Sequence, residues 1–150
     1  MFCIERIEKD RDEEALLEMA ELEKETFPDS WSRKSLEETL RNPQAVMFGA
    51  WKEEVLAGYV IFYYAADEGE IARIAVRDAF RRKGAARRLL LRLEELCKEL
   101  GVSRLLLDVR ESNGPAIAFY VGYGFKKDGI RKKFYVNPVE DAILMSYKVV

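Results

Sequence analysis

Three consecutive leucines, Leu105 to Leu107, restrict the possible folds more than any other feature of the chain. Side chains alternate between the two faces of a strand, so a run without polar positions predicts a strand that is covered on both faces. This strand, at residues 102–109, follows residues 83–100, where leucines recur at helical spacing and Gly101 stands just beyond the end. A buried strand after an amphipathic helix is typical of an α/β domain and places this strand in the middle of the sheet.

The remaining segments extend the same α/β pattern. Patterns of apolar residues predict further helices at 12–24, 32–40 and 116–121, and further strands at 4–7, 45–51, 55–65, 70–76, 125–135 and 142–149. Short polar turns separate the three strands between residues 45 and 76, which predicts an antiparallel meander. No repeat, linker or low-complexity stretch divides the chain, so we expect one domain over residues 1–150 with the element order βααβββαβαββ.

Composition excludes several classes of protein. The chain has 25 basic and 27 acidic residues, so its overall field would not attract nucleic acid or a membrane surface, and we expect no stable nucleic-acid binding. Histidine is absent, and the two cysteines, Cys3 and Cys97, have no motif spacing. A metal site or a serine–histidine triad is therefore not expected, and Cys97 fits a buried position on the long helix.

The N-terminal segment and the apolar runs bear on the compartment. The first residues become charged too early for a signal peptide, and the longest uncharged apolar run, residues 55–66, is too short to cross a bilayer. These features predict a cytoplasmic protein. The oligomeric state is not indicated by any pattern.

The basic segment Arg81-Arg82-Lys83-Gly84-Ala85-Ala86-Arg87-Arg88 stands at the start of the long helix. Cations there oppose the helix dipole by roughly 0.3–1 kcal/mol per charge, whereas Asp12, Glu13 and Glu14 open the first helix with the favourable sign. A bound anion would explain the exception, because backbone N–H groups at Gly84, Ala85 and Ala86 could hold a pyrophosphate. The spacing fits neither a P-loop nor a Rossmann turn, and a solvated basic turn is the alternative.

An ordered set of motifs resembles one known family. Ile74-Ala75-Val76 followed by Arg81 to Ala86 resembles the acetyl-coenzyme A motif of the GNAT N-acetyltransferases, a polar residue, two variable residues, glycine, one variable residue, then glycine or alanine. The likeness to this family, and to its RimI branch in the tail, continues at further positions: Phe27-Pro28, Trp31-Ser32, Asp108 to Asn113, Ala116, Tyr120, Gly124-Phe125, Tyr135, Glu140-Asp141-Ala142 and Met145. It therefore spans nearly the whole chain.

This resemblance implies a fold and a reaction. The fold would be a GNAT fold with a central mixed sheet of about seven strands, splayed in its middle and flanked by about four helices. The reaction would move an acetyl group from acetyl-CoA to a protein α-amine, typically that of a ribosomal protein. Backbone N–H groups of Ile74, Ala75 and Val76 would hold the pantetheine and polarise the carbonyl, and residues 81–87, through Arg87, would hold the pyrophosphate.

The resemblance also assigns roles to side chains. Tyr120 would protonate the leaving sulfur, and a phenol with a pKa near 10 is a suitable acid for a thiolate with a pKa nearer 8.5; an aromatic packing residue is the alternative. Asn113 would hydrogen-bond the pantetheine or simply cap the helix that follows it. The acceptor would lie between Phe27 and Trp31 on one side and Tyr135 on the other. The nearby residues 131–133 are basic, which also suits an edge strand.

Asp108 stands where the RimI branch usually has a glutamate, one methylene longer. We therefore expect it to act as the base directly or through a water, or to be a hydrogen-bonded residue at the end of a strand. Neutralising an α-amine of pKa near 8 at pH 7 costs roughly 1.4 kcal/mol, against roughly 4.6 kcal/mol for a lysine. A weak base thus favours an α-amine acceptor, with a lysine or small-molecule amine, or a catalytically silent coenzyme A-binding module, as alternatives.

Overall fold

A computed structural model describes residues 1–8 and 13–149 of the chain. The elements follow one another as predicted, βααβββαβαββ, with one additional short 3-10 helix, η1. Their bounds are β1 (Cys3–Arg6), α1 (Glu13–Thr26), α2 (Arg33–Arg41), β2 (Ala45–Lys52), β3 (Val55–Ala65), β4 (Glu68–Val76), η1 (Asp78–Phe80), α3 (Ala85–Leu100), β5 (Arg104–Arg110), α4 (Gly114–Tyr123), β6 (Lys126–Tyr135) and β7 (Glu140–Lys148). Asp12, expected to open the first helix, lies outside the described residues.

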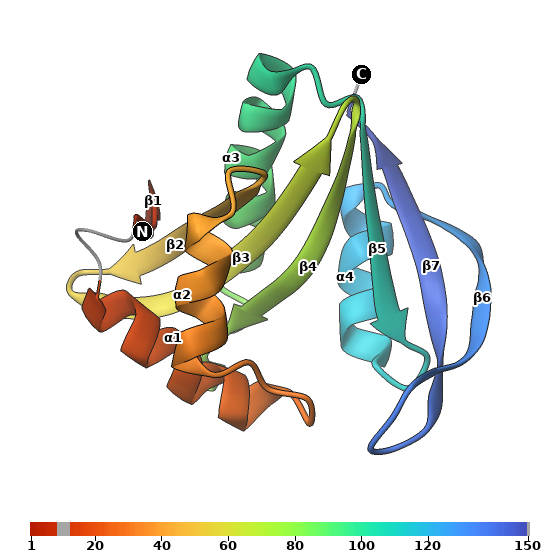
Figure 1. The fold of residues 1–150 in the computed structure, drawn as a ribbon, viewed down its shortest axis with the longest axis horizontal. Helices are drawn as coiled ribbons and strands as arrows, with labels where there is room; N and C mark the ends of the chain where they lie inside the picture. Colours follow the sequence, from red (N-terminus) through yellow and green to blue (C-terminus); the bar gives the residue numbers. More distant parts are fainter. Residues whose placement is uncertain (9–12, 150) are drawn as a thin grey trace.

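The strands form one mixed sheet in the order β1-β2-β3-β4-β5-β7-β6. Strands β2, β3 and β4 form the expected antiparallel meander, and β5, β7 and β6 pair antiparallel at the other end. The two groups meet where β4 runs parallel to β5. This is the mixed seven-stranded arrangement that the resemblance implied (Figure 1).

The sheet opens between its two central strands. Parallel pairing of β4 with β5 covers only Glu68↔Arg104, Gly69↔Leu105 and Glu70↔Leu106, after which the strands diverge toward their carboxyl ends (Figure 1). A bulge in β4 follows directly, since Arg73 pairs with Ile61 of β3 but Ile71 pairs with Phe62. The splay and the bulge therefore occupy the same few residues of β4.

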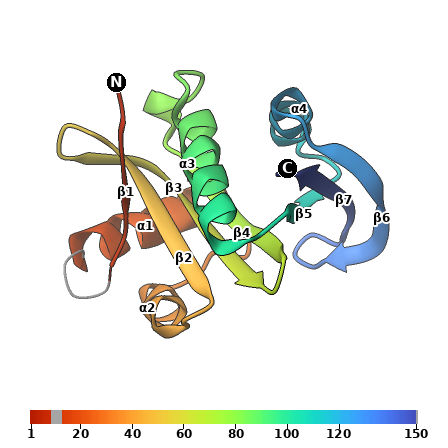
Figure 2. The same cartoon turned by 90° about the horizontal axis from the view of Figure 1, so that it is seen from above.

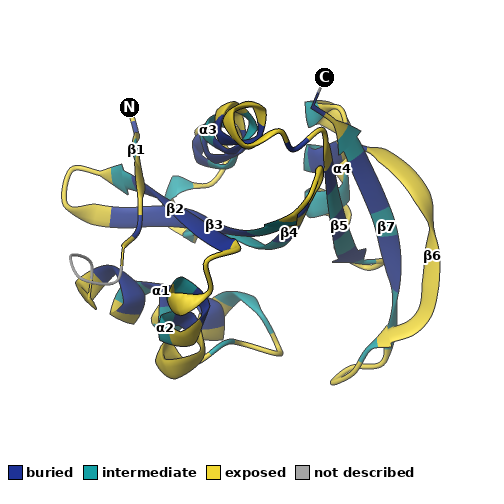
Figure 3. Ribbon diagram, turned by 45° about the horizontal axis from the view of Figure 1, so that its top comes forward, coloured by how far each residue is buried: buried dark blue, intermediate teal, exposed yellow. Residues whose placement is uncertain are grey.

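Helices cover both faces of the sheet, α1 and α2 on one and α3 and α4 on the other (Figure 2). Leucines of α3, including Leu89 and Leu93, pack with Leu105 and Leu107 of β5 in one core. Met19 and Leu22 of α1 pack with Tyr59 and other residues of β3 in the second core. The burial of β2 and β3 and the exposure of the edge strand β6 are visible in Figure 3.

Two expectations about local structure need correction. Strand β5 lies inside the sheet as predicted, but Leu106 is only partly buried, because its side chain lines a hollow next to β6 and α1 and α2 do not reach this face of the strand. The long helix begins at Ala85 and not at residue 83, with Gly84 as its N-cap in a left-handed conformation. The cations at 81–83 thus precede the helix, and only those at 87 and 88 lie in its first turn.

Candidate active site

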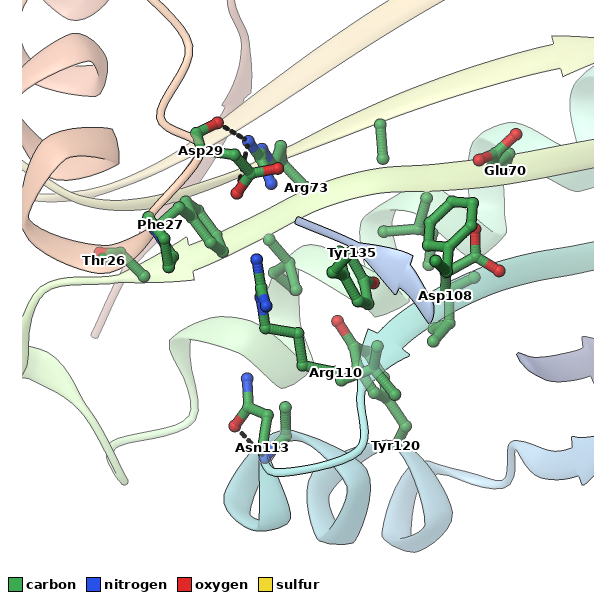
Figure 4. Close-up of a pocket in the computed structure, with 18 of the residues that line it drawn as sticks. Thr26, Phe27, Asp29, Glu70, Arg73, Asp108, Arg110, Asn113, Tyr120 and Tyr135 are labelled. Atoms are coloured by element: carbon green, nitrogen blue, oxygen red, sulfur yellow. Dashed lines mark hydrogen bonds and ion pairs between the residues drawn. The ribbon is translucent and has the colours of Figure 1, made fainter. Parts of the chain in front are cut away.

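A cavity of about 370 Å³ lies where β4 and β5 separate. Its walls come from four parts of the chain: the loop after α1, the middle of β4, the carboxyl end of β5 with the start of α4, and the end of β6 (Figure 4). These walls bring together seven of the site residues predicted from the sequence: Phe27, Trp31, Ile74, Asp108, Asn113, Tyr120 and Tyr135.

The bulge in β4 decides which side chains reach this cavity. Glu70 pairs with Tyr63 of β3 and Arg73 pairs with Ile61, so both residues lie on the α1–α2 side although they are three positions apart. In a regular strand, residues three apart would point to opposite faces. The bulge therefore adds Arg73 to the face that already carries Glu70.

Arg73 fixes the loop between α1 and α2 to the sheet. Its guanidinium lies 3.4 Å from the fully buried Glu23 carboxylate and donates a hydrogen bond of 2.6 Å to the backbone oxygen of Asp29. The same group lies over the rings of Phe27, at 4.3 Å, and Trp31, at 5.0 Å. One buried cation thus orders both aromatic residues predicted to contact the acceptor.

The buried Glu23 carboxylate has three partners, one ion pair and two hydrogen bonds. Besides Arg73, the Tyr59 hydroxyl donates to one carboxylate oxygen, and the backbone N–H of Trp31 donates to the other at 2.9 Å. Burial and the Glu23 charge both raise the pKa of Tyr59, so its hydroxyl remains a donor. A buried carboxylate with this set of partners holds α1, β3, β4 and the loop together.

Tyr120 and Tyr135 enter the cavity from α4 and from the end of β6 (Figure 4). Tyr120 is only 5% exposed and packs against the rings of Phe119 and Phe125, each at 5.4 Å. Burial raises the pKa of Tyr120, so it is a protonated donor across the neutral pH range. Burial and the charge of Asp108 raise the pKa of Tyr135 to about 12.

Two carboxylates line the cavity from opposite strands. Asp108 projects from β5 and Glu70 from β4, on the side of the cavity away from Phe27 (Figure 4). Glu70 is an exposed residue, but its carboxyl is partly desolvated in the cavity, which raises its pKa, and the Asp108 charge adds to this effect. The two side chains are therefore close enough for like-charge repulsion.

The loop between β5 and α4 is held by the hairpin of β6 and β7. Glu140 accepts a hydrogen bond of 2.6 Å from the backbone N–H of Ser112 and pairs with Arg110 at 3.2 Å. The Arg110 guanidinium also lies 4.4 Å from the centre of the Tyr135 ring. Asn113 caps α4 by accepting from the backbone N–H of Ala116 at 3.3 Å, which confirms its helix-capping role, and its side chain also lines the cavity.

The predicted anion-binding segment lies outside this cavity, in the loop between η1 and α3. Arg81 is bound to its neighbours, donating to the backbone oxygen of Val76 and pairing with Asp78. Arg82, Lys83 and Gly84 are exposed, and a Cβ at Gly84 would meet nothing within 4 Å. The open approach to the start of α3 fits an anionic group of a coenzyme.

The other predicted coenzyme contacts are spread along β4 and α3. Ala75 is buried on the α1–α2 side, whereas Ile74 and Val76 pack toward the core that contains α3. Ala85 is buried and Ala86 partly buried at the first turn of α3, and the Arg87 guanidinium lies 5.5 Å from the centre of the Tyr123 ring. The predicted coenzyme contacts therefore run without interruption from Ile74, which lines the cavity, through the exposed basic loop to Arg87 at the start of α3.

Sequence reasoning did not single out Glu70, Arg73 or the buried Glu23. A lone arginine between apolar residues of a strand, Ala72-Arg73-Ile74, was the available signal, because a charge in such a position needs a partner. Its partner is 50 positions away in the chain and could not be paired with it from spacing alone. The buried Cys97, in contrast, was predicted from its helical position; burial raises the pKa of its thiol to about 11.

Within residues 1–8 and 13–149, no group of three or more histidine, cysteine, aspartate or glutamate side chains is arranged to hold a metal ion. Among the helices described, none is both long and apolar enough to cross a membrane.

A mixed sheet that opens between its central strands, with a basic loop before a helix beside the opening, defines an acetyltransferase of the GNAT type. Residues 16–125 match the model of the Acetyltransferase (GNAT) family, and the chain belongs to that family. It is accordingly an acetyl-CoA-dependent N-acetyltransferase.

Individual relatives agree with this assignment. The chain is 36% identical over 126 residues to a putative [ribosomal protein bS18]-alanine N-acetyltransferase of Bacillus subtilis, with 83% of each protein covered. It is 33% identical over 125 residues to the [ribosomal protein bS18]-alanine N-acetyltransferase of Escherichia coli K12, with 82% of each covered. The crystal structure of the Escherichia coli ribosomal-protein-S18-alanine N-acetyltransferase superposes with a TM-score of 0.87 at 29% identity, covering 99% of this chain and 94% of that one.

Proposed function

We propose that this enzyme acetylates the N-terminal α-amine of a protein, and that its acceptor is a ribosomal protein in the cytoplasm. The observation that carries the proposal is the meeting of Asp108, Tyr120 and Tyr135 in one cavity where β4 and β5 diverge. Acetyl transfer to an amine requires a proton acceptor and a proton donor that line one space. The curated relatives, named for acetylation of a ribosomal protein alanine, support this acceptor class.

Each residue has one task in the proposed reaction. Acetyl-CoA supplies an acetyl group activated as a thioester. Asp108, directly or through a water, takes a proton from the acceptor ammonium, and the neutral nitrogen forms the new bond to the acetyl carbon as the carbon–sulfur bond breaks. Tyr120 gives its hydroxyl proton to the departing sulfur, and the second proton that the nitrogen loses as the amide forms restores the Tyr120 hydroxyl. Backbone N–H groups of β4 at residues 74–76 orient the thioester, and Asn113 offers its side chain to the pantetheine amides.

The acceptor enters between the loop after α1 and the end of β6. Phe27 and Trp31, ordered by Arg73, form one wall, and Tyr135 with the Arg110 guanidinium over its ring forms the other. The carboxylates of Glu70 and Asp108 lie on one side of the same cavity. Negative charge there suits the ammonium form of an α-amine, which is the form that predominates at pH 7.

A panel of acceptors tests this function. Thiol release from acetyl-CoA, with mass spectrometry of the products, is measured for a peptide beginning with alanine, for the same peptide with a blocked α-amine and one internal lysine, and for spermidine. We expect kcat/KM for the free α-amine to exceed the other values by at least about tenfold, because a lysine costs about 3 kcal/mol more to neutralise. Preference for lysine or spermidine would contradict the proposal, and coenzyme binding without turnover would indicate a regulatory module.

A pair of glycines at the two ends of α3 tests the coenzyme loop. Gly84 before the helix and Gly101 after it both have positive φ, 89° and 76°, and both have free space where a Cβ would stand. Replacing either by alanine should therefore cost a similar strain of about 1 kcal/mol in the free energy of unfolding. Only Gly84→Ala should also weaken coenzyme A binding, about tenfold in titration calorimetry. Equal affinities for coenzyme A in the two variants would show that the pyrophosphate does not bind at the loop around Gly84.

A further inference from the structure

We propose that Glu70 and Asp108 act as one carboxylate pair that binds the acceptor ammonium and takes its proton, so that Glu70 is a second catalytic residue. This inference rests on the proposed α-amine acetylation. It concerns a residue outside the motifs from which the active site was predicted.

The sheet geometry brings the two side chains to one place. Glu70 is the last residue of β4 paired with β5, and its partner there is Leu106. Side chains two positions apart on a strand share a face, so Asp108 lies on the face of Leu106 and therefore on that of Glu70. Both carboxylates line the central cavity, and both also line a second hollow on the β6 side.

Charges around the pair are few. Arg131 and Asp128 face the second hollow from β6, Tyr63 of β3 is the cross-strand neighbour of Glu70, and Tyr135 lies near Asp108. Arg131 lowers the pKa of Glu70, but burial and the Asp108 charge outweigh it and the pKa is raised. The two arginines of the main cavity are directed to other partners, Arg73 to Glu23 and Arg110 to Glu140. The pair therefore keeps a net negative charge toward the acceptor, although Arg131 offsets part of it.

The proton balance favours this arrangement. Before transfer, the ammonium carries one positive charge and the ionised pair two negative charges. After transfer, the amine is neutral and the pair holds one proton and one negative charge. The first proton taken up by two repelling carboxylates is bound more tightly than by one carboxylate alone, because it removes their repulsion. The pair is thus a stronger base than Asp108 alone.

The pair also accounts for the shorter side chain at position 108. An aspartate there reaches one methylene less far into the cavity than a glutamate would. Glu70 approaches from the opposite strand with the longer side chain, so the acceptor nitrogen can be contacted from both walls. The Glu70 side chain reaches this position only because β4 and β5 are still paired at residue 70 and separate directly beyond it.

The pH dependence of kcat/KM tests the pair, with an alanine-initiated peptide as acceptor. In Glu70→Gln we expect the maximum to fall about tenfold and the acid limb to move about one pH unit lower, since the remaining carboxylate no longer repels a neighbour. Glu68→Gln is the matched control, because Glu68 is exposed like Glu70 and lies on the same face of β4, but it forms an ion pair with Arg104 at the surface and does not line either cavity. It should leave both the maximum and the limb unchanged.

Two results would overturn the pair. One is a pH profile of kcat/KM for Glu70→Gln whose acid limb stays at the wild-type pH, whatever the value of its maximum. Loss of packing alone would lower the maximum without moving the acid limb. The other is obtained without turnover: the Glu70 carboxyl carbon, followed by NMR, should titrate at lower pH in Asp108→Asn than in the wild-type protein. If the Glu70 carboxyl titrates at the same pH in both proteins, the pair is excluded even if the peptide is acetylated. If the Glu70 carboxyl titrates as expected but the wild-type protein acetylates no peptide, only the proposed function is contradicted.

Discussion

Replacing Tyr120 with phenylalanine should lower kcat for acetylation of an alanine-initiated peptide by about 10²–10⁴-fold, the usual contribution of a general acid. The variant keeps the ring that packs between Phe119 and Phe125 and removes only the hydroxyl. Burial holds that hydroxyl protonated, so it can give its proton to a thiolate but does not lose it to solvent. We expect thiol release to slow by this factor in a thiol assay, and the affinity for coenzyme A to stay unchanged in titration calorimetry.

The matched control is Tyr64→Phe. Tyr64 is partly buried, stacks on Phe62 at 5.9 Å and lies outside the cavity. It should retain wild-type kcat. A Tyr120→Phe enzyme with wild-type kcat would instead make Tyr120 a packing residue, the alternative that its aromatic neighbours suggest.

Replacing Arg73 with methionine should lower the free energy of unfolding by about 3–5 kcal/mol, because it leaves a buried carboxylate without its cation. Glu23 is fully buried and the Arg73 side chain is only 10% exposed. The same change removes the contacts that order Phe27 and Trp31, so KM for the peptide should rise as well. Urea unfolding and peptide titration measure the two effects.

An exposed ion pair gives the control for Arg73→Met. Arg33 and Glu37 lie 3.0 Å apart on the surface of α2, and Arg33→Met should cost no more than about 0.5 kcal/mol. A double-mutant cycle adds Glu23→Gln to Arg73→Met. The double variant should lose less stability than the two single variants together, because no buried charge is left unpaired. Additive losses would mean that the two groups do not interact across the α1–sheet boundary.

Most of the fold was predictable from local patterns. Alternation of apolar residues gave the meander, and leucines at helical spacing with Gly101 at the end gave α3, because these patterns reflect burial on one face. The burial of β5 was predicted less well. Leu105 to Leu107 look equivalent in the sequence, but the splay leaves the face of Leu106 without a covering helix. The opening of the sheet was expected only from the family resemblance.

The site was predictable where it rests on motifs that are continuous in the chain. Asp108, Asn113 and Tyr120 lie within one such block and do meet in the cavity. Glu70 and Arg73 were missed because strand alternation puts residues three apart on opposite faces, and only the bulge in β4 brings them to one face. A bulge depends on the partner strand, and so it leaves no clear mark in the sequence of β4 itself.

If the pantetheine of acetyl-CoA lies along β4 as proposed, the short pairing between β4 and β5 makes the stability of the protein depend on the concentration of its co-substrate. Beyond Glu70, the inner edge of β4 has no partner strand among the described residues, although its neighbours Ile74 and Ala75 are largely enclosed. Amide groups in such a position need hydrogen-bond partners. The amide groups of a pantetheine chain lying along β4 would supply them, in the place of a neighbouring strand. A ligand held this way stabilises the folded state by about 2.7 kcal/mol at a concentration one hundred times its Kd. A cell rich in acetyl-CoA would then hold not only a more active population of this enzyme but also a longer-lived one.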